Sequence, residues 1–154
     1  MFSKDSAVPE FEIRPITAEV ARKLRRAVLR PTQPPETIIY PLDDAPGTLH
    51  VGAFLGNELV GITTVSHEPP PGEQNLAAWR MRGVAVIENA RGKGIGRMMA
   101  KACLDHVIQN GGTLVWVNGR TTALKFYNAL GFQTRGQEFV TDTGPHYLFW
   151  RSLE

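Results

Sequence analysis

Residues 83–97 read Gly-Val-Ala-Val-Ile-Glu-Asn-Ala-Arg-Gly-Lys-Gly-Ile-Gly-Arg, and the fold follows from this stretch. Its apolar run, Val84 to Ile87, predicts a short strand, and a glycine-rich basic turn leads directly into an amphipathic helix. Glycines let the backbone close around a ligand with its N–H groups turned inward. The first turn of a helix adds unpaired donors and the positive end of a dipole. Arg91, Lys93 and Arg97 add fixed positive charge. The stretch therefore predicts a binding site for an anion such as a pyrophosphate.

Two common phosphate-binding motifs do not fit this turn. A P-loop ends in Gly-Lys-Ser/Thr, whereas Gly96 is followed by arginine and methionine, so no hydroxyl is present for magnesium. A dinucleotide-binding turn needs G-x-G-x-x-G, and neither Gly92 nor Gly94 starts that spacing. The remaining pattern, Arg91-x-x-Gly94-x-Gly96 after a Val-Ala-Val strand, resembles the coenzyme A pyrophosphate loop of the GNAT superfamily of N-acetyltransferases. An ordinary glycine-rich turn with solvated charges is the alternative for these six residues.

Length and composition predict one domain over residues 1–154. The chain is 42% hydrophobic and 21% charged, with a net charge of +2, which is ordinary for a single domain with a core. No run of Lys or Arg indicates a nucleic-acid partner, and no apolar stretch reaches the length of a membrane span. One cysteine excludes an internal disulfide framework, and no set of metal ligands is predicted. Residues 1–10 lack the apolar core of a signal peptide and are expected to be flexible, so a cytoplasmic location is the default expectation.

Periodicity and turn signals predict the other elements. Before the glycine-rich turn they predict a strand at 11–16, a helix from Thr17 to about Arg30, an irregular segment at 31–47, a hairpin at 49–55 and 59–66, and a strand from about Leu76. After the helix that follows the turn they predict a strand at 114–117, a turn at 118–120, a short helix capped by Thr121 or Thr122, and strands at 132–140 and 146–153.

The strand before the glycine-rich turn contains an irregularity. Trp79 and Met81 lie on one alternation, while Val84 and Val86 lie on the other, so the phase slips by one residue around Gly83. A β-bulge explains the slip, because one extra residue exchanges the faces and glycine tolerates the backbone that a bulge needs. Bulges also free backbone donors.

A second motif supports the resemblance to the GNAT superfamily. Residues 118–132, Asn-Gly-Arg-Thr-Thr-Ala-Leu-Lys-Phe-Tyr-Asn-Ala-Leu-Gly-Phe, resemble its second signature, in which a Phe-Tyr pair is followed by Leu-Gly-Phe. With both signatures in order, the chain from about Ile13 onward is identified as a member. The resemblance implies an α/β (α+β) fold. Its mixed, mostly antiparallel sheet of about six or seven strands has a central parallel pair splayed apart, and about four helices flank the sheet.

The resemblance also implies the cofactor and its contacts. Acetyl-CoA would lie between the strands that end at Val86 and Val117, and the bulged strand would place an amide near the thioester carbonyl. Arg120 stands where many members have an asparagine, so Asn118 is a substitute contact. The implied cofactor-binding residues are Val84, Ala85 and Val86 for the pantetheine, Arg91, Gly92, Lys93, Gly94, Ile95, Gly96 and Arg97 for the pyrophosphate, and Asn118 and Phe126.

The implied reaction is direct attack of a primary amine on the thioester in a ternary complex. Tyr127 of the Phe-Tyr pair is the expected general acid, because a phenol with a pKa of about 10 can protonate a thiolate. Relatives that acetylate protein N-termini often have a glutamate where this chain has Val115, so the base is open. His146 is preferred over His67, Glu68, Glu73 and a water chain, because the loop before the last strand borders the acceptor side in relatives.

Several alternatives remain open for the acceptor and the activity. Arg25, Tyr40 and His67 are candidate substrate contacts, and Tyr40 with Asp43 and Asp44 is a candidate site for a cationic substrate. The expected acceptor is a small-molecule amine, with a protein N-terminus or lysine as the alternative. A non-catalytic module that binds acyl-CoA is the alternative from another functional class. A homodimer is possible, as in many relatives.

Overall fold

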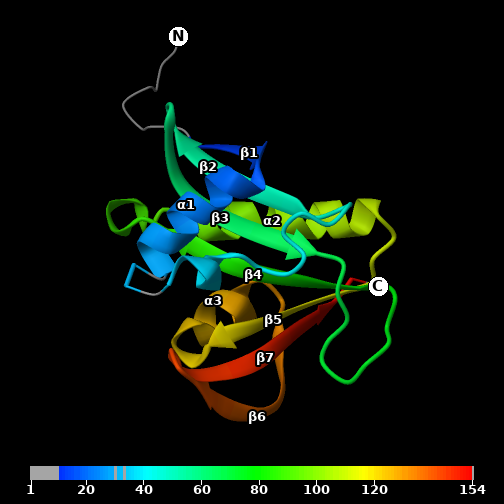
Figure 1. The fold of residues 1–154 in the computed structure, drawn as a ribbon. Helices are drawn as coiled ribbons and strands as arrows, with labels where there is room; N and C mark the ends of the chain where they lie inside the picture. Colours follow the sequence, from blue (N-terminus) through cyan, green and yellow to red (C-terminus); the bar gives the residue numbers. More distant parts are fainter. Residues whose placement is uncertain (1–10, 30, 33, 154) are drawn as a thin grey trace.

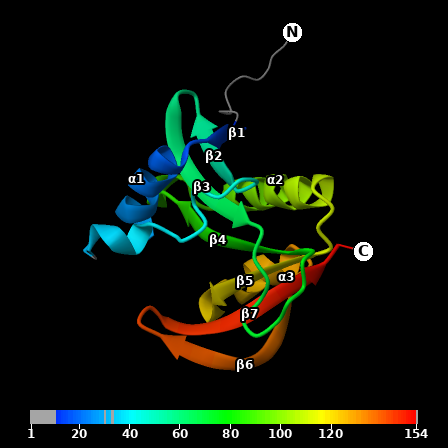
Figure 2. The ribbon, with the colours of Figure 1, turned by 45° about the vertical axis from the view of Figure 1, so that its right-hand side comes forward.

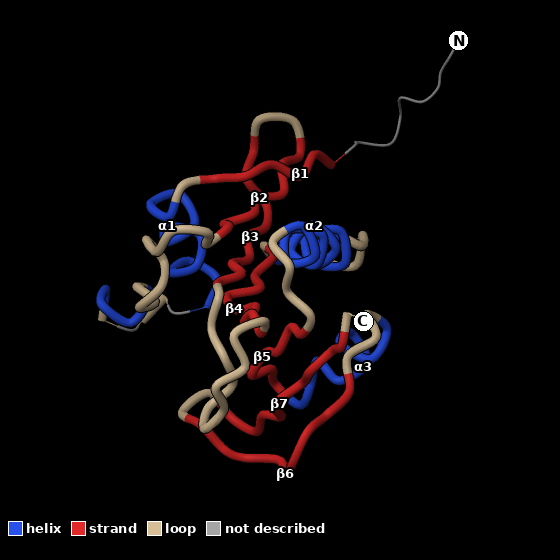
Figure 3. The backbone as a smooth tube through the Cα atoms, turned by 90° about the vertical axis from the view of Figure 1, so that its right-hand side faces the viewer, coloured by secondary structure: helices blue, strands red, loops and turns tan. Residues whose placement is uncertain are grey.

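The structure, a computed structural model, describes residues 11–29, 31–32 and 34–153. The expected flexibility of residues 1–10, and the expected end of the first helix near Arg30, concern residues outside those described. One seven-stranded sheet forms the centre of the described chain, in the order β1-β2-β3-β4-β5-β7-β6 (Figure 1). Figure 3 shows the sheet nearly edge-on, with α1 on one face and α2 and α3 on the other.

The elements follow the expected order. The strands are β1 (Phe11–Ile16), β2 (Leu49–Leu55), β3 (Glu58–Ser66), β4 (Ala78–Val86), β5 (Leu114–Arg120), β6 (Gln133–Thr141) and β7 (Gly144–Ser152). The α-helices are α1 (Ala18–Leu29), α2 (Ile95–Gln109) and α3 (Leu124–Ala129), and the short 3-10 turns are η2 (Pro35–Ile38), η3 (Glu88–Ala90) and η4 (Thr121–Ala123). Thr17 caps α1 as predicted, since its hydroxyl accepts the Val20 amide at 3.2 Å. The described residues thus contain three α-helices where about four were expected.

The sheet divides at its parallel pair, β4 and β5. Their register holds at only three pairs of residues, from Ala78 opposite Leu114 to Arg80 opposite Trp116, and the other neighbouring strands pair antiparallel. Beyond Arg80 the two strands separate, as Figure 2 shows. The predicted mixed sheet with a splayed parallel pair is confirmed.

The predicted bulge lies in β4. Ile62 of β3 faces Ala85 and Thr64 faces Arg82, so Gly83 and Val84 together face the single residue between them. Gly83 has φ of +69°, which glycine adopts without strain. The extra residue keeps the large apolar side chains of β4 against one core with α2, and this shared core contains Trp79, Met81, Val84, Val86, Met99, Cys103 and Val107. Burial raises the pKa of the Cys103 thiol to about 12, as expected of a core residue rather than a nucleophile.

Two local predictions around the second signature were wrong. The predicted turn at 118–120 is the last part of β5, because these residues pair with β7 as far as Arg120 opposite His146. Pairing with a strand distant in sequence here overrides the turn preference of Asn-Gly. The helix that follows has no side-chain cap from Thr121 or Thr122, because η4 precedes α3 and Ala123 stands at its N-cap.

Candidate active site

A cleft of about 780 Å³ opens where β4 and β5 separate. Its lining comes from both sides of the sheet: the bulged half of β4, the glycine-rich turn, the end of β5 and α3 on one side, and the end of α1, Tyr40 and the β6–β7 turn on the other. Of the expected cofactor-binding residues, the cleft lining includes Val84, Ala85, Val86, Arg91, Gly92, Gly94, Ile95, Gly96, Arg97, Asn118 and Phe126. Lys93 is exposed and does not belong to the lining.

The glycine-rich turn has the backbone of an anion-binding loop. Gly92 and Gly94 have φ of +79° and +81°, and an added Cβ at either would have no atom within 4 Å. Gly94 is the N-cap of α2, and its carbonyl accepts the Met98 amide at 3.1 Å. In the first helical turn the earlier amides have no intrahelical acceptor, so they are free to donate to a ligand. The Arg91 side chain donates to the Val86 carbonyl at 2.9 Å and fixes the turn to the end of β4.

Gly96 brings the start of α2 against α3. A Cβ at this position would lie 3.0 Å from the ring of Phe126, tighter than most side-chain contacts, so the ring would have to shift slightly. Since Phe126 and Gly96 both line the cleft, the aromatic ring forms its wall directly beside the glycine-rich turn. The two expected signatures therefore meet at one site.

Tyr127 of α3 also lines the cleft, and its ring packs against β5. It is 6% exposed, and its ring stacks on Phe149 at 4.6 Å and makes edge contacts with Phe126 and Phe132. Burial raises the pKa of its phenol to about 12, so the hydroxyl stays protonated throughout the physiological pH range. The ring belongs to the hydrophobic core, and the residue also lines the cleft.

The position of Tyr127 depends on Gly119 of β5. A Cβ at Gly119 would lie 2.5 Å from the Tyr127 ring and 3.0 Å from the Phe149 ring. Because both rings are packed on their other sides, we expect Gly119→Ala to lower the free energy of unfolding by about 1–3 kcal/mol. Urea unfolding of the two proteins measures this change, and equal midpoints with equal slopes would show that the rings move aside freely.

His146 lines the other side of the cleft, at the start of β7. Its Nδ1 lies 2.8 Å from the Gly144 carbonyl, which can only accept, so Nδ1 carries the proton. The Nε2 atom is then an acceptor, and the Thr143 hydroxyl lies 3.4 Å from it. The ring is 8% exposed and stacks on Phe139 at 5.9 Å. This arrangement makes Nε2 the ring nitrogen that can act as a base.

Arg25 is a correction to the predicted substrate contacts. Its side chain is fully buried, is absent from the cleft lining, and pairs with both oxygens of Asp43 at 2.8 and 3.2 Å. It also donates to the Thr64 hydroxyl at 3.0 Å, so its hydrogen bonds go to the interior of the protein. Burial by itself raises the pKa of Asp43. The hydrogen bonds that its carboxylate accepts, first from Arg25 and then from the Tyr40 amide and Arg22, outweigh this effect and hold the pKa below its usual value. Asp43 is therefore an ionised structural partner.

Two further expectations about the acceptor side are revised. Asp44 is paired with Arg22 at 2.9 Å, and with Asp43 buried neither carboxylate is placed to receive a cationic substrate. His67 lies outside the cleft, where it stacks on Trp79 at 4.9 Å and contacts the Leu76 carbonyl beside a separate, smaller pocket. Tyr40 does line the cleft.

The described residues contain no cluster of three or more metal-ligating side chains. Nor, within the same part of the chain, does any helix have the length and apolar character to cross a bilayer.

Comparison with known proteins connects this geometry to a family. The model of the acetyltransferase (GNAT) family matches residues 17–132, about three quarters of the chain. The chain belongs to the GNAT family. It is therefore an acyltransferase of a family that uses acetyl-CoA as the acyl donor.

Individual GNAT relatives match over nearly the whole chain. An uncharacterised N-acetyltransferase of Bacillus subtilis, YitI, is 29% identical over 92% of this chain and 96% of its own. Escherichia coli ElaA has a TM-score of 0.76 at 20% identity, covering 92% of this chain and 99% of that one. An aminoglycoside 6'-N-acetyltransferase in complex with coenzyme A has a TM-score of 0.73 at 15% identity, covering 93% and 97%. The last two likenesses concern the fold.

The cleft residues fit the GNAT cofactor. Phosphates need several convergent donors, which the glycine-rich turn and the start of α2 supply. Gly92 and Gly94 leave open space where other residues would have side chains. Beyond Arg80, the edges of β4 and β5 that face each other have no strand between them, so their backbone groups can pair with an extended amide chain such as pantetheine.

Sequence reasoning missed two GNAT cleft residues, Arg80 and Arg82 of β4. Their spacing of two in a strand places them on one face, and they immediately precede the bulge. Because Arg80 and Arg82 alternate with the apolar Trp79 and Met81, the sequence could have placed both arginines on the opposite face of the strand, next to the bulge.

Proposed function

We propose that the protein transfers the acetyl group of acetyl-CoA to a primary amine of a small molecule, by direct attack in a ternary complex. The observation that carries this proposal is the continuity of the cleft, which runs from the glycine-rich turn past Tyr127 to His146 on the other side. Donor and acceptor can thus occupy it together. Acetyl-CoA supplies an acyl group activated as a thioester.

The chain's residues have separate roles in the proposed reaction. The amides at the bulge, Gly83 and Val84, are the donors toward the carbonyl oxygen. Nε2 of His146 accepts the proton of the attacking amine, either directly or through a water molecule. Tyr127 holds its proton because of its raised pKa and donates it to the departing thiolate, which leaves as the thiol. Proton exchange with water then returns the proton from His146 and restores that of Tyr127. The C–N bond forms as the C–S bond breaks, and no covalent enzyme intermediate is needed.

Two measurements test this function together. Calorimetric titration with acetyl-CoA should show micromolar binding, and thiol release should appear when a primary amine is added to the protein with acetyl-CoA. Binding without thiol release across a broad panel of small amines would favour the acyl-CoA-binding module, and release with peptide amines alone would favour a protein acetyltransferase. No binding at millimolar acetyl-CoA would contradict the proposal.

A further inference from the structure

Arginine makes up most of the charged lining of the cleft. Among the described residues, its charged lining consists of one aspartate and five arginines: Asp142, Arg80, Arg82, Arg91, Arg97 and Arg120. Arg91 and Arg97 flank the glycine-rich turn, where the phosphates of the proposed donor would bind. Arg80 and Arg82 lie before the bulge on β4, away from that turn, so donor phosphates do not account for them.

Arg80 and Arg82 project from the face that α1 covers. Arg82 stands opposite Thr64 and Arg80 opposite Ser66 on β3, and side chains at paired positions share a face. Thr64 accepts a hydrogen bond from Arg25 of α1, which identifies that face. The acceptor side of the cleft, with Tyr40 and the end of α1, is on this same face.

Tyr40 holds Arg82 in place. The guanidinium carbons of Arg25 and Arg82 each lie 3.7 Å from the centroid of its ring, so they occupy opposite faces of that ring. The ion pair with Asp43 fixes Arg25, Arg25 fixes the Tyr40 ring, and the ring in turn restricts the guanidinium of Arg82. A planar guanidinium held in one orientation is the group that best recognises a carboxylate.

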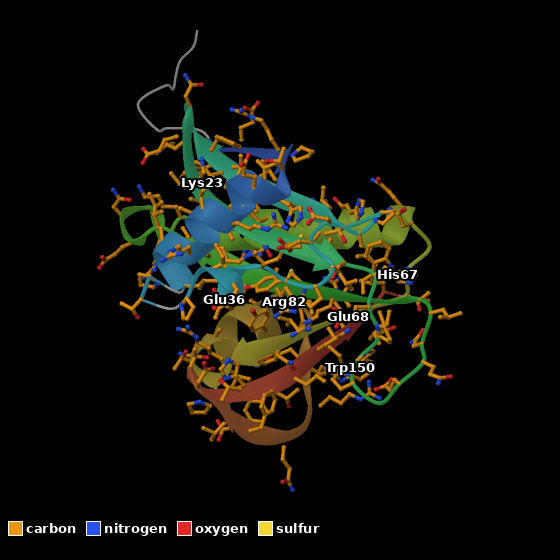
Figure 4. All side chains as sticks on the ribbon, in the orientation of Figure 1. Lys23, Glu36, His67, Glu68, Arg82 and Trp150 are labelled. Atoms are coloured by element: carbon orange, nitrogen blue, oxygen red, sulfur yellow. The ribbon has the colours of Figure 1, made fainter. Side chains whose placement is uncertain are left out.

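Among the described carboxylates, only that of Glu68 forms an ion pair with either of these two arginines. Arg80 pairs with Glu68 at 3.3 Å, and its buried Nε has no partner. Glu68 is held near them because Trp116 donates to its backbone carbonyl at 2.8 Å. Figure 4 shows Glu68 and Arg82 near each other below α1, with His67 farther to the right. Arg82 has no ion pair with a described carboxylate. Burial first, then the charge of Arg80, lower the pKa of its guanidinium, and the opposing effects of Tyr40 and of the Glu68 charge offset this only in part.

We propose that the acceptor amine carries a carboxylate a few bonds from its amino group, and that Arg82, with Arg80, binds that carboxylate. This inference rests on the proposed acetyl transfer. The short separation follows from sequence, because Arg82 directly precedes Gly83 of the bulge, where the thioester carbonyl would be held. Amino acids, and amines built like them, are the acceptor class.

Matched pairs of acceptors test the proposal. Glycine, β-alanine, leucine, phenylalanine and glutamate are compared with their α-amides (β-alaninamide for β-alanine) in the thiol-release assay. We expect kcat/KM for the best acid to exceed that of its amide at least tenfold, and Arg82→Gln to bring the ratio to about one. Arg82→Lys should retain part of the preference because it keeps the charge without the planar fork. Arg135→Gln, which removes an arginine stacked on Trp150 outside the cleft, should leave the ratio unchanged.

A binding experiment separates failure of this inference from failure of the proposed function. The N-acetyl derivatives of the same acids and amides are titrated into protein saturated with coenzyme A. Tighter binding of the acids, weakened by Arg82→Gln, supports the carboxylate site even if no amine is turned over. Turnover with amides as good as acids overturns the carboxylate site and leaves acetyl transfer standing. Equal binding of acids and amides, or binding of neither, also overturns the carboxylate site.

Discussion

Replacing Tyr127 by phenylalanine is expected to lower kcat at least about 100-fold while leaving the dissociation constant for acetyl-CoA within twofold, because a positioned general acid contributes roughly that much to a reaction rate. The substitution removes one hydroxyl and keeps the ring against Phe149, so the fold should persist. Since burial raises the pKa of this phenol to about 12, no fall in kcat from its ionisation is expected up to pH 10. Steady-state kinetics across pH 6–10, with calorimetry of both proteins, measures these effects.

Tyr147→Phe is the matched control. Tyr147 also contacts the Phe149 ring, at 6.1 Å, but it does not line the cleft. Its variant should have the kcat of the unaltered protein. If Tyr127→Phe kept full kcat as well, the leaving thiol would take its proton from water, and Tyr127 would be a packing residue.

Gly94→Val is expected to weaken acetyl-CoA binding by at least about 100-fold. Gly94 has φ of +81° at the N-cap of α2, and valine cannot adopt that backbone without strain of about 2 kcal/mol. Relief of the strain would turn the first amides of α2 away from the phosphates. Two lost hydrogen bonds to a charged group, at about 1.5–3 kcal/mol each, correspond to at least the expected 100-fold loss of affinity for acetyl-CoA. Calorimetric titration measures it.

Gly72→Val separates strain from binding. Gly72 has φ of +78°, an added Cβ there also has no neighbour within 4 Å, and it lies outside the cleft lining. Its variant should lose similar stability in urea unfolding yet keep its affinity for acetyl-CoA. Equal loss of affinity in both variants would mean that general destabilisation, not the glycine-rich turn, controls binding.

The donor side of the site was predictable from sequence because its determinants are local. A glycine at positive φ, the slip of alternation at Gly83 and the spacing of the second signature each depend on a few neighbouring residues. These features place Gly94, Phe126 and Tyr127 around one cleft, as expected.

The acceptor side was not predictable in the same way, because its side chains are placed by partners distant in the chain. Arg25 resembles the other basic residues of α1, and only the approach of Asp43, 18 residues away, makes it a buried structural cation. His67 follows β3, but its stack on Trp79 carries it away from the cleft. The end of β5 has a turn-like sequence that pairing with β7 overrides.

The two walls of the cleft are encoded in different parts of the chain. One continuous segment, from Val84 to Tyr127, supplies the glycine-rich turn, the end of β5 and α3. The opposite wall comes from separate stretches: the end of α1 with Tyr40, the start of β4, and the β6–β7 turn. Under the proposed function, exchange of these outer stretches would change which amine is accepted and leave the middle segment, which would bind the acyl donor, intact.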